Sequence, residues 1–319
     1  MKHFYLFLLL ITSCQLLAQN RVNFNQYMIN PQTYNPGYID VMNEYGASVM
    51  YRRQYLQKIS GPQNIFANGF YNISRNHGVG LSVSNESANK FNQTEAGVNY
   101  VYHLWHNETL AIGLGVQANF YQQVYNQNNY FYFDPNEPTL EATRSIAGVN
   151  FGAGISLQTR DLVVNFGMPR FFANGMVDPD NRFRMRNTAM YLSGGYKIRP
   201  AEGFVFFPSA IIKSTLGAPI SYGADLSFIL LDKYFVGAGY KSSRTVNVNF
   251  GMIFNNRLRI VYNLESMPFS SFTGAGFSHE LSVFFGQAFG PLDFGKRHHI
   301  NKSGRVKGTK KYKLKETKY

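Results

Sequence analysis

Alternation of apolar and polar residues, repeated in short stretches from residue 45 to residue 287, constrains the fold of this chain most strongly. Between Leu110 and Phe120 every even position is apolar, and positions 113, 115, 117 and 119 are glycine or amide. Strand side chains point alternately to opposite faces, so this stretch has one apolar and one polar, glycine-rich face. The links between stretches alternate between short and longer. Together these features predict a transmembrane antiparallel β-barrel.

Composition agrees with a barrel wall. Aromatic residues make up 16% of the chain and glycine occurs 29 times, which suits aromatic belts at the membrane interfaces and a lumen lined by small or polar residues. Mean hydropathy is -0.23, and no run of ~18 apolar residues follows the first 20 residues, so no membrane-spanning helix is expected. A soluble β-sandwich also alternates, but it explains the regular link lengths less well.

Most of the expected strands are about as long as the ~9–11 residues that a tilted strand needs to cross a membrane. Pro208 falls inside one of them and predicts a bulge or a local edge, because proline lacks the ladder N–H. We expect 14 strands, near 45–55, 64–74, 78–87, 94–104, 108–123, 147–158, 161–168, 188–198, 204–213, 219–230, 233–241, 245–254, 257–264 and 277–287.

The lengths of the links predict the orientation of the barrel. Links after even-numbered strands are tight, whereas links after odd-numbered strands are mostly longer, with two large loops near 124–146 and 169–187. Bacterial barrels place short turns in the periplasm and long loops outside the cell. We therefore expect an outer-membrane protein with both termini in the periplasm.

The first 19 residues resemble a secretory signal peptide, with Lys2 and His3 before an apolar run and a cleavage region near Ala18 or Gln19. A rival reading is lipidation at Cys14, because residues 11–14 (Ile-Thr-Ser-Cys) fit a lipoprotein box. Cys14 is the single cysteine, so we expect no disulfide in the processed chain.

Two further segments flank the expected barrel domain of residues 45–290. Residues 20–44 do not alternate and carry Asn-Pro turn signals at Asn30-Pro31 and Asn35-Pro36, which suggests an ordered periplasmic or plug segment. Residues 291–319 form a basic tail. From Lys296 to Tyr319 there are ten Lys or Arg and one acid, giving +9 of the chain's +13. The tail has too little apolar content to fold alone.

The basic tail is a candidate contact for a periplasmic partner. Export from the cytoplasm argues against nucleic acid, so an acidic protein, anionic lipid headgroups or peptidoglycan fit its charge better, with a merely solvated extension as the alternative. The candidate partner-binding residues are Lys296, Arg297, Arg305, Lys307, Lys310, Lys311, Lys313 and Lys315.

Five short motifs, in order along the chain, resemble the PorP/SprF family of type IX secretion system membrane proteins from Bacteroidetes. The first motif is Gln-Tyr-Met-x-Asn-Pro at residues 26–31 followed by Asn-Pro-Gly-Tyr at residues 35–38, and the second is Tyr-Arg-Arg-Gln-Tyr at residues 51–55 followed by Gly-Pro. The third is Pro208 with Lys213, and the fourth is Ala218-Pro219 with Asp225-Leu226. The fifth is the His-Glu pair at residues 279–280 in the terminal strand. Gly37 stands where Ala is more usual, and Tyr55 where Trp is. The family motif residues are Gln26, Tyr27, Asn30, Pro31, Asn35, Pro36, Tyr51, Arg52, Gln54, Gly61, Pro62, His279 and Glu280.

The resemblance implies a non-enzymatic outer-membrane component that works with the type IX translocon and supports secretion or surface attachment of a partner adhesin, often one used in gliding. It implies no catalytic, cofactor or metal residues. His279 and Glu280 are neighbours on an expected strand, so their side chains point to opposite faces and do not form an acid–base pair. Two alternatives stay open: a channel for small hydrophobic solutes with residues 20–44 as its plug, and a structural protein that grips peptidoglycan.

Overall fold

The computed structural model describes residues 24–54, 61–106, 110–126, 143–172, 188–215, 218–254, 258–267 and 276–286. The leader and the basic tail lie outside these residues, so their predicted roles and the domain boundaries stay predictions. Within this part of the chain the elements are η1 (Pro31–Thr33), β1 (Tyr45–Arg53), β2 (Gln63–Asn72), β3 (His77–Ala88), β4 (Phe91–His106), β5 (Leu110–Asn126), β6 (Thr143–Gln158), β7 (Leu162–Met168), β8 (Ala189–Tyr196), β9 (Ile198–Ala201), β10 (Phe204–Thr215), β11 (Ser221–Leu230), β12 (Tyr234–Lys241), β13 (Thr245–Phe254), β14 (Leu258–Ser266) and β15 (Ser278–Phe285).

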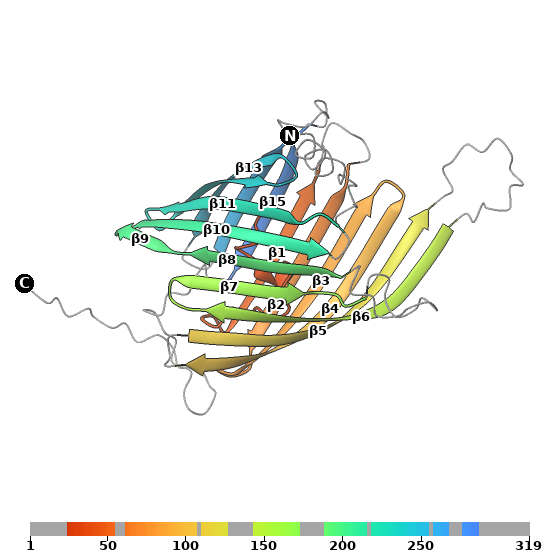
Figure 1. The fold of residues 1–319 in the computed structure, drawn as a ribbon, viewed down its shortest axis with the longest axis horizontal. Coiled ribbons are helices and arrows are strands. Elements are labelled where there is room, and N and C mark those ends of the chain that lie inside the picture. Colours follow the sequence, from red (N-terminus) through yellow and green to blue (C-terminus); the bar gives the residue numbers. More distant parts are fainter. Residues whose placement is uncertain are drawn as a thin grey trace, which may run out of the picture.

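The strands form one closed antiparallel barrel (Figure 1). Strands that follow one another in sequence pair, except that β8 and β9 both pair with β10, and β1 pairs with β15 to close the sheet, with Arg52 opposite Glu280. β9 continues the line of β8 after a break at Lys197, so the barrel has 14 strands. Closure removes every long sheet edge, as a membrane-spanning sheet requires. The predicted fold class is confirmed.

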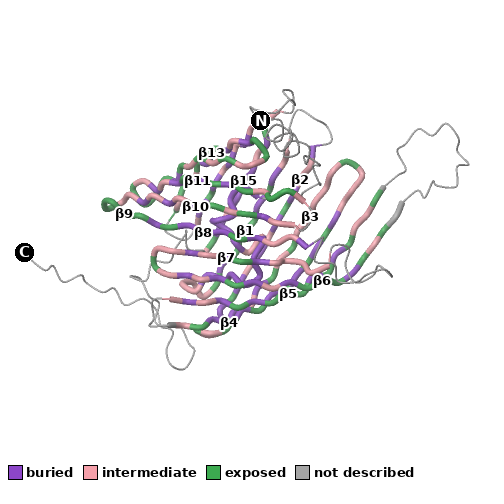
Figure 2. The backbone as a smooth tube through the Cα atoms, in the orientation of Figure 1, coloured by how far each residue is buried: buried purple, intermediate pink, exposed green. Residues whose placement is uncertain are grey.

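The outer face of the wall is apolar and the inner face is polar, the reverse of a soluble β-sandwich. On β13, Asn247 and Asn249 are buried inside, whereas Val248 and Phe250 are about half exposed on the outside. Figure 2 shows the same alternation of buried and exposed positions along the strands. Lipid must therefore cover the outer face, because exposure of so many large apolar side chains to water would be unfavourable.

Pro208 lies opposite the break between β8 and β9. The β10 ladder pairs Ser209 with Gly195 of β8 and Phe206 with Ile198 of β9, and the register then shifts between Phe206 and Phe204. Since proline donates no ladder hydrogen bond, the interruption at this point has a direct cause. The irregularity expected from the sequence is present.

The two ends of the barrel differ in their links. At one end the links are short: Leu231 and Asp232 both have positive φ in the turn between β11 and β12, and two residues join β9 to β10. The opposite, long-loop end carries the connections before β2, β6, β8 and β15, although the links after β3 and β12 are also short. β5 and β6 reach further than expected, to Asn126 and from Thr143, so the predicted loop 124–146 includes strand residues at both ends.

Candidate functional site

Residues Phe24–Glu44, here called the lumen segment, lie inside the barrel and form the candidate site. Between residues 24 and 40 every side chain except Gln32 and Thr33 is buried. The segment contains η1 but makes no strand, so its backbone and amide groups need partners from the wall. The polar inner face supplies them. A wide barrel whose own side chains cannot fill it thus gains a core.

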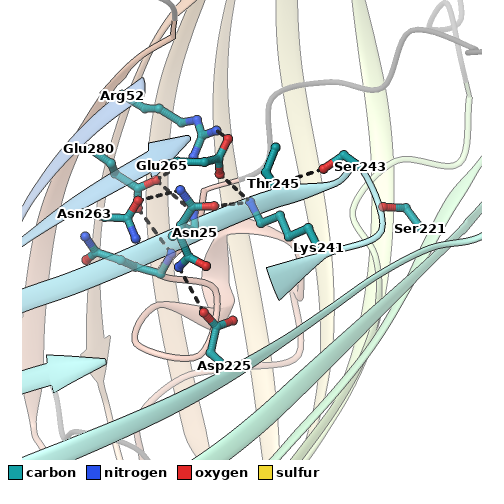
Figure 3. Close-up of polar contacts among 12 residues, drawn as sticks. Asn25, Arg52, Ser221, Asp225, Lys241, Ser243, Thr245, Asn263, Glu265 and Glu280 are labelled. Atoms are coloured by element: carbon teal, nitrogen blue, oxygen red, sulfur yellow. Dashed lines mark hydrogen bonds and ion pairs between the residues drawn. The ribbon is translucent and has the colours of Figure 1, made fainter. Parts of the chain in front are cut away.

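Glu280 of β15 fixes the start of the lumen segment. Its two carboxylate oxygens accept the backbone N–H groups of Asn25, at 2.8 Å, and Gln26, at 3.2 Å. Arg52 of β1 donates to the same carboxylate at 3.1 Å, and its other terminal nitrogen donates to Glu265 at 2.8 Å (Figure 3). Arg52 therefore bridges two strands across the closure of the barrel while Glu280 holds the segment.

Lys241, which is partly buried, completes a group of charges with the buried Arg52, Glu265 and Glu280, and we call these four residues the ion cluster. Its ammonium lies 3.3 Å from Glu265 and donates to the side-chain carbonyl of Asn25. Asn25 in turn donates to Asn263 at 2.6 Å. The cluster thus contains two cations and two carboxylates. Pairing of this kind allows charges to be buried, because an unpaired buried charge would destabilise the fold by several kcal/mol.

Further along the segment, amide side chains hold it to the middle of the wall. Asn30 donates to Ser48 at 2.7 Å and to Asn68 at 2.9 Å. Asn35 donates to the backbone carbonyl of Ile155 at 3.0 Å and to Asn165 at 3.1 Å, and its own carbonyl oxygen accepts the N–H of Gly37 at 2.9 Å.

Buried tyrosines pack between these anchors. Tyr34 shares a 2.6 Å hydrogen bond with Ser193 and its ring lies 5.5 Å from that of Tyr191. Tyr27 and Tyr34 are both buried, so these tyrosines act here as large packing groups with a polar end.

Glycines in the wall make room for the segment's backbone. A Cβ on Gly113 would lie 2.5 Å from the carbonyl oxygen of Gly37, and one on Gly154 would lie 2.8 Å from the Gly37 nitrogen. A Cβ on Gly37 would itself meet the Gly154 carbonyl and lie 2.7 Å from the Ile155 nitrogen. The lumen glycines of β5 and β6 therefore match a glycine in the segment, and the substitution of Gly37 for the more usual Ala fits this close approach.

The structure brings some of the family motif residues together and separates others. Gln26, Arg52 and Glu280 meet at the ion cluster, whereas Tyr51 and His279 point to the outer face, as their parity requires. The remaining motif residues line the segment or the rim. Tyr27, Asn30, Pro31, Asn35 and Pro36 are buried in the lumen segment, and the N–H of Gln54 donates to the Pro62 carbonyl at 2.8 Å beside Gly61.

At the ion cluster, Asn25, Lys241 and Glu265 carry no motif signal. Lys241 and Glu265 occupy inward positions at or next to the long-loop ends of their strands, β12 and β14. An ionisable residue at an inward position is a signal that could have marked them. The predicted partner-binding tail residues, from Lys296 onward, lie outside the described residues.

Above the lumen segment is an open cavity of about 470 Å³ that we call the vestibule. Phe24, Tyr27, Gln32, Thr33 and Tyr34 lie along its floor. Its wall consists of inward residues near the long-loop ends of the strands, including Arg52, Ser84, Glu95, Arg170, Lys213 and Glu265. Arg170 follows β7 and pairs with Glu95 of β4, so the start of the predicted loop 169–187 folds inward. The vestibule is therefore a concave site at the long-loop end of the described barrel.

A closed antiparallel barrel with an apolar outside and a polar inside belongs to the class of outer-membrane β-barrel proteins. Within that class the chain belongs to the PorP/SprF family, because the family model described as type IX secretion system membrane protein PorP/SprF matches residues 16–285. The resemblance seen in the motifs is confirmed, and the protein is an outer-membrane component of the type IX secretion system.

The chain is similar to several solved structures at low sequence identity. The outer-membrane protein Omp33 of Acinetobacter baumannii is 10% identical, with 77% of this chain and 99% of that chain covered and a TM-score of 0.46. The TodX deltaS2S3 mutant of a monoaromatic hydrocarbon channel is 10% identical over 82% and 93% of the two chains, with a TM-score of 0.43. The KdgM porin is 9% identical over 75% and 98%, with a TM-score of 0.38.

No curated protein matched the chain. Among the residues that the structure describes, no helix has the length and apolar character needed to cross a membrane.

Proposed function

We propose that this protein is a non-enzymatic secretion component that supports the export or surface attachment of a partner adhesin. Membership of the family assigns the protein to the type IX secretion system. The observation that supports binding of a partner adhesin is the vestibule. Its floor is the protein's own buried segment, so the described barrel offers a receptacle at one end rather than an open passage. A receptacle at the cell surface suits a protein that holds another protein.

The chemistry of the vestibule fits a polypeptide occupant. Four of its charged wall residues already have partners there: Arg52 pairs with Glu265 as well as with Glu280, and Arg170 pairs with Glu95. Aromatic side chains of Tyr34 and Tyr191 lie beside hydroxyl and amide groups. Such a lining offers apolar contacts and hydrogen bonds and does not require its occupant to carry a net charge. This suits a polypeptide, whose surface mixes apolar and polar groups.

The experiment is to delete the gene, complement it with the wild-type protein or with a variant, and compare cell-surface proteomes by mass spectrometry. Ser84→Trp places a large side chain in the vestibule, and its neighbour Val83 faces the lipid, so Val83→Trp is the matched control. We expect deletion to remove one or a few large surface proteins. Ser84→Trp should restore them poorly and Val83→Trp fully, at equal barrel levels.

An unchanged surface proteome on deletion would contradict the secretion role and favour solute transport, the alternative function. Equal restoration by both tryptophan variants would instead retain the secretion role but move the contact site away from the vestibule.

A further inference from the structure

The lumen segment has a direction. Its first residues lie toward the long-loop end, because Asn25 and Gln26 are held by Glu280, two residues from the long-loop start of β15, and Asn25 also accepts from Lys241, the last residue of β12. Figure 3 shows Asn25 in the middle of these side chains.

The other end of the segment lies at the short-turn end. Asn72, the last residue of β2, donates to the backbone carbonyls of Asp40 at 2.8 Å and Asn43 at 2.7 Å. Gln158, the last residue of β6, donates to the carbonyl of Ile39 at 3.1 Å. Both strands end at the short turns. The chain therefore passes through the lumen from the long-loop end to the short-turn end before β1 begins.

This direction limits where the preceding residues can go. Below Phe24 the lumen is occupied by the segment itself, whose side chains from Ile29 to Ile39 are buried apart from Gln32 and Thr33. Above Phe24 is the vestibule, of which Phe24 forms part of the floor. Short turns face the periplasm in bacterial barrels, so the vestibule opens toward the cell surface.

We propose that the amino terminus of the processed chain emerges through the vestibule at the cell surface. After cleavage near Ala18 or Gln19 the terminus is about five residues from Phe24, a reach of at most about 18 Å. This proposal replaces the expectation of a periplasmic N-terminus. It does not depend on the proposed adhesin role, because a channel with the same segment would have the same topology. A lipid on Cys14 would likewise have to be carried on the surface side.

The test is cysteine labelling of the full-length protein in living cells with a membrane-impermeant maleimide. Cys14 is the single cysteine and falls within the leader, so single-cysteine variants of the processed chain have little background. Val22→Cys reports the N-terminus. Ser243→Cys, exposed in the link after β12, marks the long-loop end, and Glu202→Cys, exposed in the turn before β10, marks the short-turn end.

We expect Val22→Cys and Ser243→Cys to be labelled on intact cells, and Glu202→Cys to be labelled only after the outer membrane is permeabilised. Labelling of Val22→Cys only after permeabilisation, or only after denaturation, would overturn the proposal. Labelling of Glu202→Cys but not Ser243→Cys on intact cells would overturn the orientation on which it depends. A surface proteome unaffected by gene deletion would overturn the proposed function and leave this result unchanged.

Discussion

At the scale of single residues, the barrel wall holds charges that are matched among themselves: Arg52 pairs with Glu265 and Glu280, and Lys241 pairs with Glu265. Arg52 has 2% and Glu280 1% of its side chain exposed, so water screens neither. Removing one member of a buried ion pair costs about 3–5 kcal/mol, because the partner is left with an unmatched charge.

The substitution Glu280→Gln keeps the shape of the side chain but removes its charge. We expect it to lower the free energy of unfolding by several kcal/mol, since Arg52 and Lys241 would then share one carboxylate, that of Glu265. Urea unfolding of the purified barrel in lipid vesicles measures the change. Leu281→Met, next in sequence and facing the lipid, should have little effect. A similar loss in both variants would show that the ion cluster does not stabilise the barrel.

A second residue-scale prediction concerns the glycines. Gly154→Ala should destabilise the protein by about 1–3 kcal/mol, the usual cost of overpacking, because the new methyl group meets the backbone of Gly37. In Gly194→Ala the nearest atoms are 3.6 Å and 3.9 Å away, and the side chain points outward, so this control should be close to neutral. The same unfolding experiment compares the two. Equal stability of the variants would show that the segment does not pack against β6 as closely as described.

At the scale of elements, the sequence predicted the strands of the barrel wall better than the contacts inside the lumen. Strand parity follows from local alternation, and all 14 expected strands are present, because each strand's pattern is fixed by lipid on one side and lumen on the other. Boundaries were less accurate where strands continue beyond the membrane: β4 and β5 run to 16 and 17 residues. Outside the lipid the apolar constraint ends while strand pairing continues.

The contacts inside the lumen could not be predicted in the same way. Parity indicates that Arg52 and Glu280 face inward, but their meeting depends on the register between β1 and β15, whose sequence positions are 228 residues apart. The irregular path of residues 24–44 has no periodicity from which to derive contacts. Motif resemblance selected Gln26, Arg52 and Glu280 at the ion cluster, without indicating that they touch. It also selected Tyr27, Asn30, Pro31, Asn35 and Pro36 of the lumen segment, without indicating which wall residues they contact.

The lumen segment as an element should determine conductance. Asn35 holds the segment to β6 and β7 and accepts the N–H of Gly37, so Asn35→Ala leaves buried polar groups unpaired, at about 1–3 kcal/mol each. We expect few openings from wild-type protein in planar bilayers and frequent openings from Asn35→Ala. Thr33→Val is the control, because Thr33 donates to Asn30 within the segment rather than to the wall. A large, steady conductance from the wild type would contradict a filled lumen.

At the scale of the whole molecule, charge is distributed unevenly between barrel and tail. Residues 296–319 carry +9 of the chain's +13, so the pI of about 9.6 is largely a property of the tail. β15 ends at the short-turn end of the barrel, which is the end that bacterial barrels place in the periplasm, and we therefore expect the tail there. The tail and the vestibule would then face opposite compartments, one suited to machinery and the other to cargo.

Truncation after residue 295 should therefore leave the barrel folded and in the outer membrane while it weakens coupling to a periplasmic partner. Electrostatic contacts of exposed Lys and Arg weaken as salt screens them, so the defect in the surface proteome should be mimicked in part by growth of the wild type in high salt. Replacing the ten Lys and Arg by Gln keeps the tail's length and tests its charge alone. If the truncated protein delivers surface proteins normally in low and high salt alike, the tail is a solvated extension without a coupling role.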